Sequence, residues 1–188
     1  MYKKILMPIV VLSVITTLLI IVGFNKETKI LVNTDINERY LESFKVNNEE
    51  LVKENDRKFG KDINKSSLNI QVFNLVEVEN KTDITFYDAE IKGVIKSPTG
   101  NFNIKGTGDL QKLKLSNEKW IYNGDFEGEV INKIGTDTVT LSFLYDPETK
   151  ETSIGLTSGL LGDIALLPFG QSFLSKQEII ELDEIIRK

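Results

Sequence analysis

Apolar and polar residues alternate along much of the chain between Leu68 and Thr157, and turn-forming residues interrupt the alternation at intervals. A period of two is typical of a β-strand that buries one face, and clusters of Asn, Asp, Gly, Pro and Ser mark turns between strands. The pattern predicts an antiparallel meander of about six strands, within 68–78, 84–95, 102–115, 120–130, 139–145 and 152–157.

The phase of the alternation predicts which side chains share a face. In the first predicted strand, a single apolar face holds Leu68, Ile70, Val72, Val76 and Val78. In the second, Ile84 and Phe86 follow one phase, whereas Ile91 and Ile95 follow the other. A shift of phase within a strand usually marks a β-bulge, so we expect one in this second strand.

Helical signals flank the meander. N-capping pairs at 35–38 and 47–50 precede two short amphipathic segments, and a capping box at Ser175–Glu178 opens a C-terminal helix. The stretch 25–34 has the composition of a tether. The mostly apolar stretch Gly159–Leu174 either covers the sheet or lies on a membrane surface. We therefore expect an α+β fold, in which N- and C-terminal helices cover the apolar face of a curved sheet.

The N-terminal stretch Ile5–Phe24 carries no charge and follows Lys3 and Lys4. Its length, roughly 20 residues, suffices for a helix to cross a bilayer. A cleaved signal peptide is the alternative, but no small-residue cleavage motif follows the stretch. A buried core helix is disfavoured because the stretch has no polar face. The two lysines favour a cytoplasmic N-terminus, so we expect a single-pass signal anchor in the cell membrane and an extracytoplasmic main domain.

These signals divide the chain into three parts. Residues 1–24 form the cytoplasmic N-terminus and the transmembrane anchor, and residues 25–66 form the tether and a helical segment. Residues 67–188 form the extracytoplasmic β-domain with its C-terminal helix.

Composition narrows the possible chemistry. The 188-residue chain has no His and no Cys, and its formal net charge is −5. It therefore has no disulfide, thiolate nucleophile, imidazole base or zinc site of the usual kind. The negative balance argues against a nucleic-acid partner, which requires clustered Lys and Arg. We expect neither enzyme activity nor a cofactor, and a hydrolase that uses only Asp, Glu, Lys, Ser or Tyr is the least favoured alternative.

Three carboxylates, Asp125, Glu127 and Glu129, occupy every second position of one predicted strand. Side chains two residues apart share a face, so these acids line the side opposite the apolar one, and a solvated outer face is the favoured interpretation. Calcium binding would require more oxygen ligands from a folded-back loop, and glycoside hydrolysis would require a cleft. We expect no metal site and no catalytic residue here, with Lys105 or Lys133 balancing part of the charge.

Glycines recur on the apolar faces of two neighbouring strands. Glycine weakens a strand, so its presence indicates either strong curvature or a hollow that admits a ligand. Curvature around the terminal helices is the favoured reading. The alternative defines a candidate surface for a ligand or partner, which consists of Trp120, Tyr122, Gly124, Phe126, Gly106 and Gly108.

Short sequence matches follow the predicted anchor: Lys58–Ile63, Ala89–Val94, Ser97–Gly100 and Trp120. In these matches the chain resembles the single-span cytochrome-oxidase assembly factors and their relatives in mitochondrial import machinery. The resemblance covers about half of the chain, and the residues after Asn132 depart from it. It implies a non-catalytic helper of a membrane complex.

The sequence therefore predicts a membrane-anchored, non-catalytic module that binds a protein partner near the membrane or assists assembly. The second hypothesis is a carrier that holds an apolar, lipid-like ligand between the curved sheet and residues 159–174.

Overall fold

The computed structural model describes residues 29–41, 49–131, 135–160 and 163–187. Within them, eight strands form one antiparallel sheet, and each strand pairs with the next along the chain. The strands are Ile30–Asp35 (β1), Ser67–Asn80 (β2), Ile84–Ser97 (β3), Gly100–Lys114 (β4), Trp120–Ile131 (β5), Thr136–Tyr145 (β6), Thr152–Leu160 (β7) and Asp163–Gly170 (β8). The labelled helical elements are Glu49–Phe59 (α3), Ile63–Lys65 (the 3-10 helix η1) and Lys176–Ile186 (α4), and residues 38–41 are also helical.

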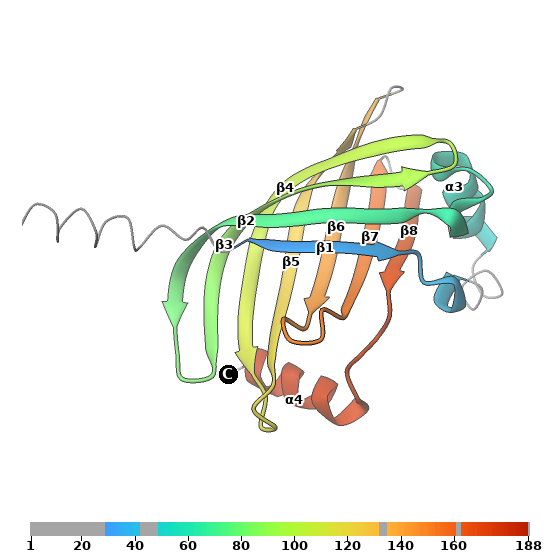
Figure 1. Ribbon diagram of the computed structural model, residues 1–188. Helices are drawn as coiled ribbons and strands as arrows, with labels where there is room; N and C mark the ends of the chain where they lie inside the picture. Colours follow the sequence, from blue (N-terminus) through green and yellow to red (C-terminus); the bar gives the residue numbers. More distant parts are fainter. Residues whose placement is uncertain (1–28, 42–48, 132–134, 161–162, 188) are drawn as a thin grey trace, which may run out of the picture.

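The sheet curls until its two edge strands meet, which makes a nearly closed barrel (Figure 1). β1 reaches β8 through an isolated bridge between Ile36 and Phe169. Next to this bridge, the N–H of Asn37 donates to the carbonyl of Pro168 at 2.8 Å. The first and last strands of the meander therefore close the same barrel.

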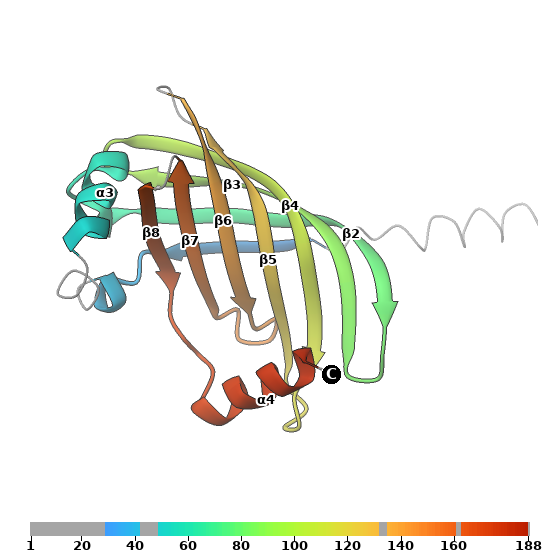
Figure 2. The same ribbon diagram turned by 180° about the vertical axis from the view of Figure 1, so that it is seen from behind.

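A side chain of α3 takes the place of a neighbouring strand on part of β8. The amide of Asn55 donates to the carbonyl of Leu166 at 2.9 Å and accepts from the N–H of Leu166 at 3.0 Å. Asn55 is buried, so these bonds satisfy backbone groups that would otherwise lack partners. They hold α3 against β8, at one end of the barrel (Figure 2).

The inner faces of the strands form the main core. Inward residues alternate with outward ones, as the period of two requires. At the α3 end, the rings of Phe59 and Phe102 pack edge to face with centroids 5.3 Å apart. The hydroxyl of Thr99 also donates to the carbonyl of Phe59 at 3.0 Å. The helix thus closes this end of the core.

A second, smaller core lies on the outer face, beneath α4 at the other end of the barrel (Figure 2). Leu182 of α4 packs there with Leu113 of β4 and Ile121 of β5. The capping box predicted at Ser175–Glu178 is confirmed: the N–H of Glu178 donates to Ser175 Oγ at 3.2 Å, and the N–H of Ser175 donates to Glu178 Oε2 at 2.8 Å.

The predicted fold class is wrong. The α+β arrangement with about six strands assumed that terminal helices cover the apolar face of the sheet. Instead, the apolar face is covered by the opposite wall of the same eight-stranded sheet. The two additional strands come from stretches predicted to have other roles. β1 begins in the predicted tether, and β8 lies in the stretch Gly159–Leu174. Most of that stretch is part of the sheet and does not cover it.

The bulge predicted in 84–95 is also wrong, because β3 pairs with β4 in unbroken register. Ile84 and Phe86 face outward into the small core under α4, whereas Ile91 and Ile95 face inward. The phase shift in the sequence therefore arises because the outer face of β3 is buried near Ile84 and the inner face is buried near Ile91, along a regular strand.

No helix within residues 29–41, 49–131, 135–160 and 163–187 combines the length and the apolar character needed to span a bilayer. The predicted anchor, Ile5–Phe24, lies outside the described residues.

Candidate functional site

The pairing register between β2 and β3 breaks just beyond Val72, the last residue of β2 that pairs with β1. Phe73 pairs with Glu90 and Val76 pairs with Asp88, so two residues of β2 lie opposite a single residue of β3. Asn74, the first of the two, has a φ of 52°, a left-handed conformation that Asn tolerates better than most residues. This is the geometry of a β-bulge.

The bulge changes the face that the following residues occupy. Val76 lies opposite the outward-facing Asp88, and a second register shift follows between Glu77 and Glu79. Val76 and Val78 are 60% and 62% exposed. The prediction that both share the buried face of Leu68 is therefore wrong.

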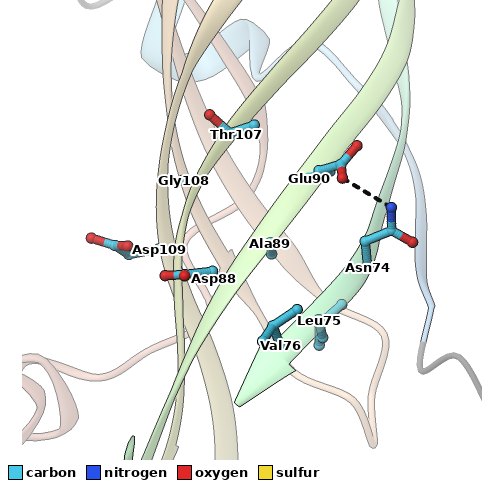
Figure 3. Close-up of a pocket in the computed structure, with 9 residues that line it drawn as sticks. All are labelled: Asn74, Leu75, Val76, Asp88, Ala89, Glu90, Thr107, Gly108 and Asp109. Carbon is cyan, nitrogen blue, oxygen red and sulfur yellow. Dashed lines mark hydrogen bonds between the residues drawn. The ribbon is translucent and has the colours of Figure 1, made fainter. Parts of the chain in front are cut away.

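A groove of about 710 Å³ lies beside this bulge, and we call it the β2 groove (Figure 3). It is open to solvent. Its lining comes from β2, β3 and β4, and consists of Asn74, Leu75, Val76, Asp88, Ala89, Glu90, Thr107, Gly108 and Asp109. The groove thus combines apolar side chains with three carboxylates and no cation.

The carboxylates of the groove belong to a larger acidic face. In the register of the sheet, Asp88 lies opposite Asp109, and Asp109 lies opposite Asp125. Like charges placed directly opposite each other on neighbouring strands destabilise a sheet. Within the described residues, Asp88 and Asp109 form no ion pair, whereas Glu90 accepts a hydrogen bond from the amide of Asn74 at 2.9 Å. The charges of Asp88 and Asp109 on this face are therefore not balanced by ion pairs within the described residues.

The predicted acid row lies on the same outer face. Asp125, Glu127 and Glu129 are all exposed. Ser142 donates to Asp125 at 2.8 Å, and Lys105 forms an ion pair with Glu129 at 3.0 Å, which is one of the two balancing contacts that the sequence suggested. Among the described residues, no group of three or more acids is arranged to hold a metal ion.

Of the six residues of the candidate surface, Gly108 lines the β2 groove, and the others lie in the barrel interior or at one barrel end. Tyr122, Gly124 and Phe126 are buried. Trp120 is half-buried, with Lys112 Nζ 4.5 Å from its ring centroid. A binding role for the six residues of the candidate surface therefore stays a prediction.

Gly106 and Gly108 of the candidate surface allow β4 and β5 to approach each other closely. A Cβ on Gly106 would lie 2.4 Å from the carbonyl oxygen of Glu127, and one on Gly108 would lie 2.1 Å from that of Asp125. Real Cβ atoms do not come this near to a backbone oxygen. The glycines therefore permit the bend of β4 against β5, which is the curvature that the sequence favoured, although around a barrel and not around helices.

Three tyrosines gather at the barrel end opposite α3. The ring centroids of Tyr122 and Tyr145 are 6.4 Å apart. Burial, with further contributions from the nearby Tyr87 and Tyr145, raises the pKa of Tyr122 above its ordinary value. Burial also raises the pKa of Tyr87, and Glu77 adds to the effect. The raised pKa values keep the hydroxyls of Tyr87 and Tyr122 protonated.

The middle of the barrel is solid. Five interior residues on five different strands have 0% exposed surface: Ile70, Phe126, Leu141, Leu156 and Leu167. No space that would admit a water molecule therefore adjoins these side chains. Eight-stranded barrels are either filled by side chains or hold one small ligand. At these layers the barrel is filled.

Reasoning from the sequence missed the β2 groove. The residues that form it read as ordinary members of alternating strands, and the acids appeared in separate strands. Asn74 was the available signal, because Asn is depleted in strand interiors and tolerates the left-handed conformation.

No family model, curated protein or solved structure matches this chain. The resemblance to the cytochrome-oxidase assembly factors stays a prediction.

Proposed function

We propose that this protein is a non-catalytic binding module that engages another protein at the outer surface of the cell membrane, to which Ile5–Phe24 attaches it. The observation that carries the proposal is the β2 groove. Val76 and Val78 are exposed beside it. Exposed apolar side chains rimmed by polar groups are characteristic of interaction sites.

The packed interior weighs against the second hypothesis, an apolar-ligand carrier. The stretch 159–174 that was to enclose the ligand supplies strands to the barrel wall, and Phe126 and Leu156 in the interior have no exposed surface. A lipid-like ligand would have to displace packed side chains, which costs free energy.

The arrangement of acids weighs against the hydrolase alternative. Asp125, Glu127 and Glu129 lie on an exposed strand face. Carboxylates that act as an acid–base pair need an enclosed site in which the pKa of one of them is raised.

Site-specific photo-crosslinking of the full chain in its native membrane tests the proposal. A photoreactive residue at Val78 is expected to give a discrete protein adduct, and the same adduct is expected from Val76. The matched control is Ile180 of α4, which is 52% exposed but lies on a different surface. Equal labelling at all three positions, or no adduct at the two valines, would overturn the proposal.

A further inference from the structure

The sheet has an unpaired edge beside the β2 groove. β1 pairs with β2 only from Ser67 to Val72. In the described part of the chain, no strand pairs with the same side of Phe73–Asn80. Unpaired backbone N–H and C=O groups on a strand edge are a template for another strand. The exposed Val76 and Val78 lie on this unpaired stretch.

The charge around this edge restricts what can add to it. Glu77 and Glu79 lie on the edge itself, and Asp88 and Glu90 lie on the neighbouring strand. Nearby, Lys81 forms an ion pair with Glu79 at 3.4 Å, so part of the charge is balanced. The remaining carboxylates leave the surface negative.

A second copy of this chain does not fit the edge. Two copies that met edge to edge would bring their glutamates and aspartates together, and the net charge of −5 adds long-range repulsion.

We infer that the outer edge of Phe73–Asn80 accepts an extended, Lys- or Arg-bearing segment of a partner protein as an additional strand. This inference rests on the proposed function and names the chemistry of the partner. The backbone of the segment pairs with the free edge. Its cationic side chains lie on the outer face, where their aliphatic stems contact Val76 and their charged ends face Asp88 and Glu90. Asp109 adds to the same negative field. Main-chain pairing supplies affinity in this mode, whereas side chains supply specificity.

Hydrogen exchange of the purified full chain in detergent tests the edge. The probe is a peptide of alternating lysine and valine, about eight residues long, which as an extended strand spans Phe73–Asn80. We expect its addition to slow the exchange of amides within Phe73–Asn80. A peptide of alternating glutamate and valine is expected to leave them unchanged. Protection at another surface, or equal protection by the acidic peptide, would overturn the inference.

Variants that neutralise acidic residues test whether the partner segment is cationic. The double variant Asp88→Asn with Asp109→Asn is expected to weaken binding of the lysine peptide by about tenfold or more. Its matched control is Asp183→Asn with Glu184→Gln on α4, which changes the charge equally and is expected to keep wild-type affinity. Both pairs are exposed, so neither is needed for folding. Equal affinity of the two double variants would contradict the inference.

Two further outcomes separate this inference from the proposed function. If the amides of Phe73–Asn80 exchange slowly before any peptide is added, the edge is already occupied, and the inference fails. If the crosslinks from Val76 persist in the Asp88→Asn and Asp109→Asn variant, the proposed binding function stands while the cationic partner is excluded.

Discussion

At the scale of single residues, the surroundings of a backbone atom decide whether a side chain is tolerated. Gly108 and Gly155 are both strand glycines, but they differ in this respect. A Cβ on Gly108 would meet the carbonyl oxygen of Asp125 at 2.1 Å, whereas one on Gly155 would have no neighbour within 4 Å. The first glycine is required by the bend of the barrel wall, and the second is not.

This difference predicts opposite outcomes for the same substitution. Gly108→Ala is expected to lower the free energy of unfolding by about 2 kcal/mol or more, because β4 and β5 would have to separate. Gly155→Ala is expected to change it by less than about 0.5 kcal/mol. Urea unfolding of both variants measures the difference. Similar losses for the two would contradict the assigned role of Gly108.

Asp146 is a buried charge that organises the turn between β6 and β7. Its carboxylate accepts hydrogen bonds from the N–H groups of Glu148 at 2.8 Å and Thr149 at 3.2 Å. Lys119 Nζ lies 3.4 Å away. Burial acts to raise the pKa of Asp146, but these hydrogen bonds outweigh burial and hold the pKa below its ordinary value.

A lowered pKa means that the ionised form of Asp146 stabilises the fold. This contribution is fully present above the pKa of an unfolded Asp, about 3.9. It is lost as the pH falls through the lower pKa of the folded state. Asp146→Asn is therefore expected to cost about 1–3 kcal/mol at pH 7, and the deficit should shrink as the pH falls below about 4. Urea unfolding across this pH range checks both parts, and a deficit independent of pH would rule out the electrostatic explanation.

At the scale of elements, the barrel seam depends on a side chain as well as on strands. Asn55 of α3 pairs with both backbone groups of Leu166, as a neighbouring strand would. The seam between β1 and β8 is otherwise short, because an isolated bridge and one adjacent hydrogen bond join them in the described residues. α3 therefore helps to close the sheet in addition to capping the core.

Asn55→Ala is expected to lower the free energy of unfolding by about 1–3 kcal/mol, because it leaves the partly buried N–H and C=O of Leu166 without these partners. The exchange of the Leu166 amide should also accelerate. Asn69→Ala, on the exposed face of β2, is the control and should change stability by less than about 0.5 kcal/mol. If the Leu166 amide were to exchange at the wild-type rate in Asn55→Ala, the seam would not depend on this side chain.

At the scale of the whole molecule, a filled barrel places binding on the outside. Interior residues such as Phe126, Leu141 and Leu156 have no exposed surface. The acids and the exposed valines are instead on the outer surface, where α4 covers only one end (Figure 2). The molecule therefore offers a partner its wall and its strand edge.

This arrangement predicts that the full chain does not take up a long-chain fatty acid. Native mass spectrometry after incubation with palmitate is expected to show the unliganded mass. Stoichiometric retention of palmitate would show that the interior opens, and would favour the carrier hypothesis over the protein-binding one.

The sequence by itself determined the local structure of this protein. The period of two located β2 to β7, because a strand with one buried face must alternate. The capping box at Ser175–Glu178 located α4, because its two reciprocal hydrogen bonds involve only neighbouring residues. The exposure of Asp125, Glu127 and Glu129 followed from the same alternation.

Only the tertiary structure decided how the sheet closes and where the groove lies. β1 and β8 became strands through their pairing with neighbours and through the bridge from Ile36 to Phe169, contacts that join distant parts of the chain. The outward turn of Val76 depends on the register of β2 against β3. Closure and register arise from pairing between strands, so the pattern of any one strand does not encode them.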